Sequence, residues 1–198
     1  MTIGHRERKK QRTREQIVES AFALFRERGY HATTVADIAA AADIAPRTFF
    51  AYFPSKEAVV FFDFDETFAS LKTTIEQRAP EEGTIDALRR WIVDALPAEH
   101  HEGDTADLRK RMCIDEPALE AHQRHLLGRL EGVLRAGMAR DLGEPPDALR
   151  PKLVAAATVA ALQAIDESNA DKRRSMGLLD EALIFLRAGV EALRPATP

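Results

Sequence analysis

The chain has 198 residues, of which 45% are hydrophobic and 30% are charged, proportions that are ordinary for a globular protein. No apolar run approaches the roughly 18 residues that indicate a membrane span, and the polar N-terminus lacks the apolar stretch of a secretory signal. A single cysteine, Cys113, excludes an intrachain disulfide and fits a reducing compartment. We therefore expect a cytoplasmic protein with no membrane association.

The net charge of −4 is unevenly distributed along the chain. Residues 1–56 hold 10 Lys and Arg against 6 Asp and Glu, whereas the remainder holds 18 against 26. A basic segment joined to an acidic remainder indicates that only the N-terminal part meets a polyanion. Charge alone is equally compatible with a tail that merely keeps the protein soluble.

Helices are expected throughout, because Ala, Leu, Glu and Arg dominate and no run alternates regularly between apolar and polar residues. The first helix is expected over 9–28, where apolar residues recur at helical spacing. It ends at Gly29, a residue type that commonly follows a helix. A short second helix is expected over 35–41, because Thr34 and Asp37 have the spacing of a capping box.

A turn at Asp43 leads into the third helix, which begins at Pro46 and ends before Pro54. Ser55 then caps a long fourth helix, rich in Phe, over 56–78. Gly and Pro separate five further helices, expected at about 84–96, 105–114, 117–142, 147–168 and 176–193. The sequence thus predicts about nine helices and no strand.

The second and third helices have the helix-turn-helix pattern of two short helices joined by a tight turn. On a wheel of about 100° per residue, Phe49 and Phe53 share the face that packs on the first two helices. The opposite face carries a cation, a hydroxyl, a methyl and a phenol, from Arg47, Thr48, Ala51 and Tyr52. Such a face suits the major groove of DNA, although Arg47 and Tyr52 are also compatible with a solvated surface. Phe50 lies on the flank, where DNA contact and packing against the fourth helix are both open.

The stretch TTVADIAAAADIAPRTFFAYFPSKEAV closely resembles the DNA-binding signature of TetR-type repressors. In that signature a Thr opens the second helix, an Ile-Ala pair and a turn follow, and an aromatic third helix precedes a Lys-Glu pair. The match covers about residues 9–62, and the form PRTFFxYFPSK looks like that of an actinobacterial subgroup. The resemblance implies an all-α fold, with a three-helix helix-turn-helix DNA-binding domain over 1–56 and a helical ligand-binding and dimerisation domain over 57–198.

By this resemblance nine residues are expected to contact DNA: Arg12, Thr34, Pro46, Arg47, Thr48, Phe50, Ala51, Tyr52 and Lys56. Arg12 would reach the minor groove or a phosphate from the basic arm, and Thr34 and Lys56 would contact phosphates. Asp43 and Ala45 depart from the signature, which usually has Gly and Ser or Thr there. Phe50 stands where a Tyr is usual, so its phosphate hydrogen bond is missing and Tyr52 is the candidate to replace it.

The resemblance further implies a small-molecule pocket among helices four to seven and a homodimer formed through the last two helices. The last helix carries an apolar stripe suited to a four-helix interface, made of Leu179, Ala182, Leu183, Leu186, Val190 and Leu193. The same stripe is compatible with burial inside one subunit. Candidate pocket residues are Phe61, Phe64, Phe68, Trp91, Met112, Leu126 and Leu130, which are equally compatible with ordinary core. They indicate an apolar or amphipathic effector.

No phosphate-binding loop or nucleophile motif is present in the sequence. His122, His125 and Cys113 do not have the spacing of a usual zinc motif, so we expect no metal, no cofactor and no enzymatic activity. The preferred interpretation is a homodimeric transcriptional regulator, a repressor that binds a palindromic double-stranded operator and is released by a small ligand. A helical adaptor that binds protein through its third helix stays an alternative, as does, with less support, an all-helical enzyme.

Overall fold

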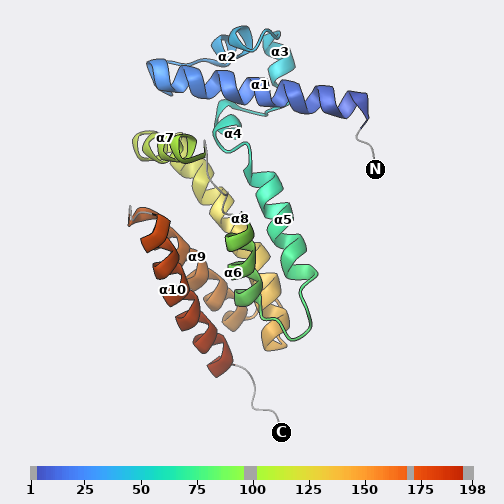
Figure 1. The fold of residues 1–198 in the computed structure, drawn as a ribbon, viewed down its shortest axis with the longest axis vertical. Helices are drawn as coiled ribbons and strands as arrows, with labels where there is room; N and C mark the ends of the chain where they lie inside the picture. Colours follow the sequence, from blue (N-terminus) through green and yellow to red (C-terminus); the bar gives the residue numbers. More distant parts are fainter. Residues whose placement is uncertain (1–3, 96–101, 169–171, 194–198) are drawn as a thin grey trace. The chain divides into compact units, whose positions relative to one another are not determined.

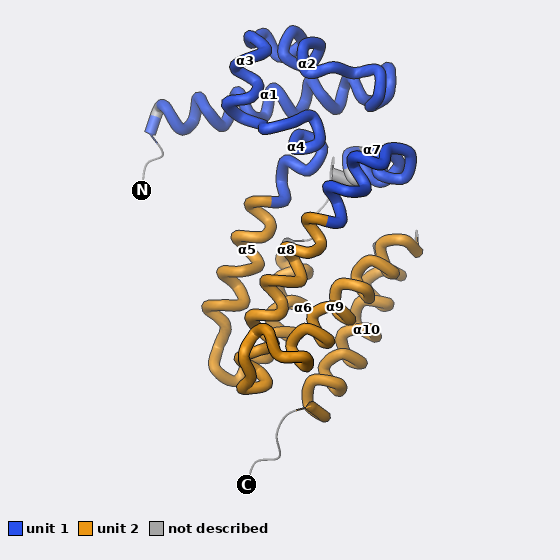
Figure 2. The backbone as a smooth tube through the Cα atoms, turned by 180° about the vertical axis from the view of Figure 1, so that it is seen from behind, with its two compact units in different colours: residues 1–64, 99–124 blue, residues 65–98, 125–198 orange. Residues whose placement is uncertain are grey.

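The computed structural model describes residues 4–95, 102–168 and 172–193. Over these residues the chain forms ten α-helices and no strand, which confirms the all-α prediction. The chain divides into two compact units, one of residues 1–64 and 99–124 and the other of residues 65–98 and 125–198 (Figure 2). Each unit is described by itself.

The first unit holds the predicted helix-turn-helix. Its elements are α1 (His5–Arg28), α2 (Val35–Ala41), α3 (Pro46–Phe49), α4 (Lys56–Val60), α7 (Glu102–Asp115) and the first two turns of α8 (Pro117–Leu142) (Figure 1). Ile17 and Ala21 on α1 and Ile38 on α2 are fully buried, as their helical spacing predicts. These apolar faces, together with Phe49 of α3, form the core that fixes the three helices against one another.

The ends of α1 and α2 follow from local sequence. Gly29 ends α1 with a φ of +84°, in the region that side chains other than Gly rarely adopt. At α2 the predicted capping box is present, since the Thr34 hydroxyl accepts from the Asp37 N–H and the Asp37 carboxylate accepts from the Thr34 N–H. After α2, Asp43 has a φ of +53°, so it takes the turn conformation for which the TetR signature uses Gly.

The predicted continuous fourth helix over 56–78 is wrong. The structure ends α4 at Val60, inserts a turn over 61–63, and starts α5 (Phe64–Glu76) after it. Tertiary contacts account for the break: the Arg14 guanidinium donates to the Phe62 carbonyl, and the Phe62 ring packs edge-on against Phe22 of α1. Helical periodicity did not reveal this, because the run of Phe residues has partners on several sides.

The second unit is a bundle of α5, α6 (Thr84–Ala95), the rest of α8, α9 (Leu149–Glu167) and α10 (Lys172–Leu193) (Figure 2). Its core is aliphatic and centres on Leu71, Ile75, Leu134 and Met138. At Gly137 the helix α8 approaches its neighbours so closely that an added Cβ would lie 2.6 Å from the Thr84 hydroxyl oxygen and 2.9 Å from the Ile75 Cγ2.

The apolar stripe of α10 is part of this core. Leu179, Leu183, Leu186 and Val190 are each about 95% buried within the unit, and Leu193 packs against the same cluster. The alternative of burial inside one subunit is therefore correct for the stripe, and its assignment to subunit pairing is wrong. The exposed apolar residues of α10 are Ile184 and Phe185, at 68% and 76% exposure, on a different side of the helix.

Candidate DNA-binding and effector sites

The third helix is shorter than predicted, because α3 ends at Phe49 and a turn over 50–52 takes the place of its second half. Phe49 and Phe53 are buried, at 0% and 2% exposure, and hold the helix to its unit. Four of the predicted DNA-contacting residues, Pro46, Arg47, Phe50 and Ala51, are exposed, while Thr48 and Tyr52 are partly buried. Phe50 is 56% exposed and touches Phe49 edge-on, with ring centres 5.4 Å apart, so it belongs to the surface of α3 and not to a core formed with the fourth helix.

The residues that flank this helix differ in how many of their side-chain hydrogen-bonding groups already bond within the protein. Arg12 is exposed on α1. Thr34 is exposed too, but its hydroxyl serves the α2 cap. Lys56 donates from its Nζ to the carbonyl oxygens of Tyr30 at 2.8 Å and Thr33 at 2.9 Å, which occupies two of the three ammonium protons. The start of α4 is thereby fixed to the turn that follows α1.

Tyr30, Lys56 and Glu57 form a polar anchor between that turn and α4. The Lys56 Nζ lies 3.9 Å from the centre of the Tyr30 ring, and the Tyr30 hydroxyl donates to Glu57 at 2.8 Å. Burial, and then the Glu57 contact, raise the pKa of Tyr30, so its hydroxyl stays a donor. Burial would raise the pKa of Glu57, but hydrogen bonds from its own N–H, Ser55 and Tyr30 outweigh it and lower that pKa.

Sequence reasoning missed two arginines that bind the turn between α4 and α5. Arg14 donates to the Phe62 carbonyl, and its guanidinium lies 5.0 Å from the Phe53 ring, which follows the turn after α3. Arg109 of α7 donates to Asp63 at 3.0 Å and lies 5.4 Å from the Phe64 ring. For Arg14 a signal was available, since it lies three residues before buried Ile17 and so shares the buried face of α1.

The seven candidate pocket residues do not converge. Phe61, Phe64 and Met112 belong to the first unit, where Phe61 stacks on His122 and Met112 lines a small hollow beside the end of α1. In the second unit, Leu126 is buried and Leu130 packs against the aliphatic core. Trp91 also packs there, and its indole N–H donates to the Ser70 hydroxyl at 3.1 Å. Of the seven, only Phe68 lines the larger hollow.

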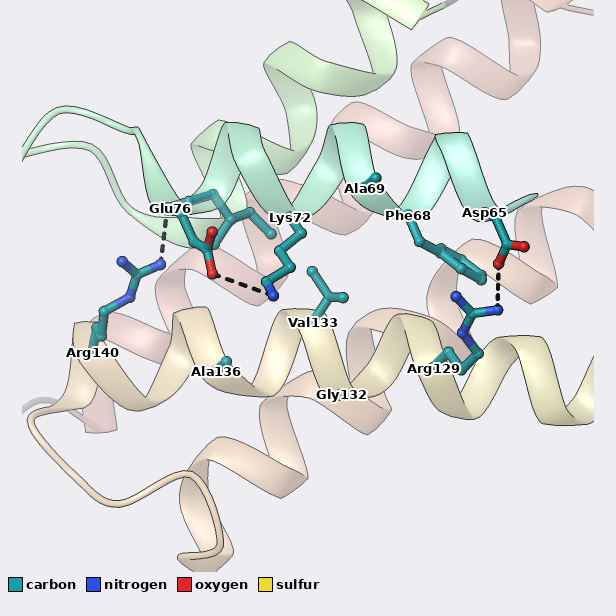
Figure 3. A pocket seen from close by; sticks show the side chains of 11 residues that line it. Asp65, Phe68, Ala69, Lys72, Glu76, Arg129, Gly132, Val133, Ala136 and Arg140 are labelled. Carbon is teal, nitrogen blue, oxygen red and sulfur yellow. Dashed lines mark hydrogen bonds and ion pairs between the residues drawn. The ribbon is translucent and has the colours of Figure 1, made fainter. Parts of the chain in front are cut away.

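That larger hollow is a groove of about 730 Å³ between α5 and α8 (Figure 3). Its apolar surface comes from Phe68, Ala69, Ile75, Gly132, Val133 and Ala136, and its charged groups are Asp65, Lys72, Glu76, Arg129 and Arg140. Arg129 pairs with Asp65 at 2.7 Å and lies 4.8 Å from the Phe68 ring. The size falls within the range of about 300–1,000 Å³ that is usual for small-molecule sites.

Within the described ranges, no group of three or more His, Cys, Asp or Glu side chains is arranged to hold a metal ion. No helix among the same residues is long and apolar enough to cross a membrane.

Comparison with known proteins identifies the family. A model of bacterial regulatory proteins of the tetR family matches residues 17–61, and a model of the MftR C-terminal domain matches residues 82–191, more than half of the chain. The chain belongs to the TetR family. This TetR-family protein is a DNA-binding transcriptional regulator and not an enzyme, which confirms that part of the preferred interpretation over the adaptor and the enzyme.

Named relatives span almost the whole chain. The transcriptional regulator TcmR of Streptomyces glaucescens is 29% identical over 97% of this chain and 87% of its own length. The transcriptional repressor DhaR of Mycobacterium sp. (strain GP1) is 28% identical over 93% of both chains. The TetR-family protein is thus similar to regulators from actinobacteria, as the form of its signature indicated.

Solved structures share its fold at lower identity. The SmeT–triclosan complex superposes with a TM-score of 0.61 at 20% identity, covering 94% of this chain and 99% of SmeT. Thermus thermophilus FadR in complex with lauroyl-CoA superposes with a TM-score of 0.60 at 22% identity, covering 93% and 98%. At this identity the likeness confirms the fold of the TetR-family protein, a helix-turn-helix followed by a helical domain.

Proposed function

We propose that this TetR-family protein is a homodimeric repressor that acts on DNA in the cytoplasm and is released from a palindromic operator by a small ligand. Residues 1–56 bind the operator, and residues 57–198 bind the ligand and form the dimer. The observation that carries the proposal is the exposed face of α3, where Arg47, Phe50 and Ala51 point away from a core anchored by Phe49.

The exposed face of α3 offers different chemistry to bases and to phosphates. Arg47 supplies paired donors that match guanine, while Phe50 and Ala51 supply carbon surface that matches a thymine methyl. Pro46 and Thr48 complete the contact in the major groove. On the flanks, Arg12, Thr34, Tyr52 and Lys56 approach phosphates, which position the helix without reading sequence.

Dimerisation is supported by apolar side chains left exposed on the last two helices. They are Leu149 at 78% and Leu153 at 58% on α9, with Ile184 at 68% and Phe185 at 76% on α10. Exposed Ala156 and Ala160 continue the surface along α9 and allow a close approach. A second copy that covers this surface makes a two-fold dimer, whose paired α3 helices read a palindrome.

Release requires a ligand that binds one conformation of the dimer more tightly than the one that fits the operator. SmeT and Thermus thermophilus FadR have been solved with triclosan and lauroyl-CoA, of which triclosan is largely apolar and lauroyl-CoA joins an apolar acyl chain to a charged, phosphate-bearing group. By analogy, we assign an apolar or amphipathic effector to the second unit. Phe68 is the candidate residue that we retain for contact with it, because it lies in the groove between α5 and α8.

The salt dependence of DNA binding tests the proposal against the adaptor alternative. Fluorescence anisotropy would measure the affinity for a duplex pool enriched by the protein from random sequence. Each phosphate that the protein neutralises contributes about −0.9 to the slope of log affinity against log salt, so we expect a steep fall as salt rises. A slope near zero, or equal affinity for enriched and unselected duplexes, would contradict the proposed function.

A further inference from the structure

The groove between α5 and α8 combines an apolar floor with cations on both walls (Figure 3). We propose that this groove is the effector site and that its effector is an amphipathic anion, with an apolar body over Phe68 and Val133 and a carboxylate at Lys72. The inference rests on the proposed function and adds to it a place in the structure and a chemical class of ligand.

Space in the groove comes from small residues on facing helices. Ala69 on α5 and Gly132 and Ala136 on α8 leave room that larger side chains would fill. An added Cβ at Gly132 meets nothing within 4 Å, whereas at Gly137 it would lie 2.6 Å from Thr84. The same helix is therefore closely packed at Gly137 and open at Gly132, which places the space for a ligand about 1.4 turns from the core contact.

The cations of the groove differ in how firmly each is held. Arg129 is fixed by Asp65 at 2.7 Å and by the Phe68 ring, and Arg140 donates to the Ile75 carbonyl at 2.9 Å. Lys72 is held more loosely, because its contact with Glu76 is 3.8 Å, longer than a hydrogen bond. Lys72 is thus the cation that can turn to a ligand, and Figure 3 shows its ammonium reaching over the groove beside Val133.

The charge of the lining favours an anion over a neutral or cationic ligand. Three cations, Lys72, Arg129 and Arg140, face two carboxylates, Asp65 and Glu76, so the lining carries one net positive charge. A carboxylate balances that charge, whereas an ammonium head group would add to it. A neutral ligand would cover the Lys72 ammonium without replacing the hydrogen bonds that it makes to water.

Three probes with the same apolar body separate these possibilities: decanoate, decanol and decylammonium, each below the concentration at which it forms micelles. Isothermal titration calorimetry on the full chain, without DNA, would measure their binding. A charge-assisted hydrogen bond is worth roughly one power of ten in affinity, so we expect decanoate to bind about tenfold more tightly than decanol. Decylammonium should bind more weakly than either.

Two pairs of variants locate the site. Lys72→Gln should weaken decanoate binding about tenfold and leave decanol binding unchanged. Arg173→Gln removes an equal charge from an exposed position of α10 and should change neither. Gly132→Leu should abolish binding of decanoate by filling the groove. Gly128→Leu should leave decanoate binding intact. Gly128 is an exposed α8 position outside the lining of the groove, and an added Cβ there meets nothing within 4 Å.

Failure of decanoate to bind, equal binding of decanoate and decylammonium, or undiminished binding to Gly132→Leu would overturn the inference. Anisotropy with the enriched duplex, in the absence of any probe, is measured on the same preparations. If duplex binding is intact while decanoate fails, the groove assignment falls and the regulator stands. If duplex binding itself fails, the proposed function falls.

Discussion

Arg47 and Phe50 lie about one turn apart and are both exposed, and in the proposed complex they would meet different parts of a base pair. The Arg47 guanidinium matches the two acceptors of guanine, whereas the Phe50 ring offers only carbon. Helical periodicity predicted the division of this helix into core and surface, because burial of Phe49 and Phe53 is a property of spacing. Periodicity placed Phe50 on the flank but left open whether its ring is exposed or packed, because that depends on how far the neighbouring Phe49 ring covers it.

Removal of the Arg47 side chain should reduce affinity for the enriched duplex more than affinity for unselected DNA. We expect Arg47→Ala to lower affinity for the enriched duplex by about 1–3 kcal/mol and to change affinity for unselected DNA much less. Arg26→Ala, which removes a charge from the last turn of α1, serves as the control. Anisotropy at constant salt gives both affinities, and an equal loss on the two duplexes would mean that Arg47 touches phosphate alone.

Contact between Phe50 and a thymine methyl can be tested from the DNA side. Replacing thymines of the enriched motif one at a time by deoxyuridine removes a single methyl, worth about 0.8 kcal/mol if fully buried. We expect one substitution to weaken wild-type binding about fourfold and to have no effect on Phe50→Ala. If every deoxyuridine duplex binds the wild-type chain normally, Phe50 does not read a methyl.

At the scale of elements, the sequence predicts helix ends that depend on adjacent residues and misses those that depend on long-range contacts. Capping at Thr34 and chain reversal at Gly29 and Asp43 depend on a few adjacent residues, so the sequence predicts them well. The break between α4 and α5 depends on Arg14, which lies 48 residues from Phe62 along the chain. Long-range side-chain contacts of this kind leave no local pattern, and the single long helix predicted over 56–78 was wrong for that reason.

Two glycines on α8 should respond in opposite ways to the same substitution. Gly137→Ala places a methyl 2.6 Å from Thr84 and should cost about 1–3 kcal/mol of unfolding free energy through overpacking. Gly132→Ala meets open space and should raise stability by up to about 1 kcal/mol, since Ala favours helix over Gly. Urea unfolding followed by circular dichroism measures both; equal effects would mean that the helix does not pack closely at Gly137.

For the whole molecule, the surface that the proposed dimer would use is the exposed apolar face of α9 and α10. Sequence reasoning placed the dimer on these helices but chose the stripe that fills the subunit core, because α10 is apolar on more than one side. Burial separates the two sides: Leu183 is 3% exposed and Phe185 is 76% exposed. Most of the pocket candidates pack in the core instead of lining one cavity, because a large apolar residue is buried in a core more often than it lines a cavity.

Disruption of this face should separate the subunits. We expect Phe185→Glu to convert the dimer to monomer at micromolar concentration, because an acid on each copy would be buried without a partner. Ile114→Glu makes a similar change at a residue of α7 that is 78% exposed, and it should stay dimeric. Light scattering reports the mass, and a wild-type monomer or a dimeric Phe185→Glu would remove the proposed interface.

The central claim is that two copies of the chain read a palindrome through α3. Selection of fragments bound by the wild-type chain from the organism's genomic DNA, followed by sequencing, tests it most directly, with Arg47→Ala selected in parallel. We predict a motif with two inverted half-sites that is enriched by the wild-type chain and weakened at the guanine positions for Arg47→Ala. A motif with a single half-site, or no motif shared by the bound fragments, would contradict the account.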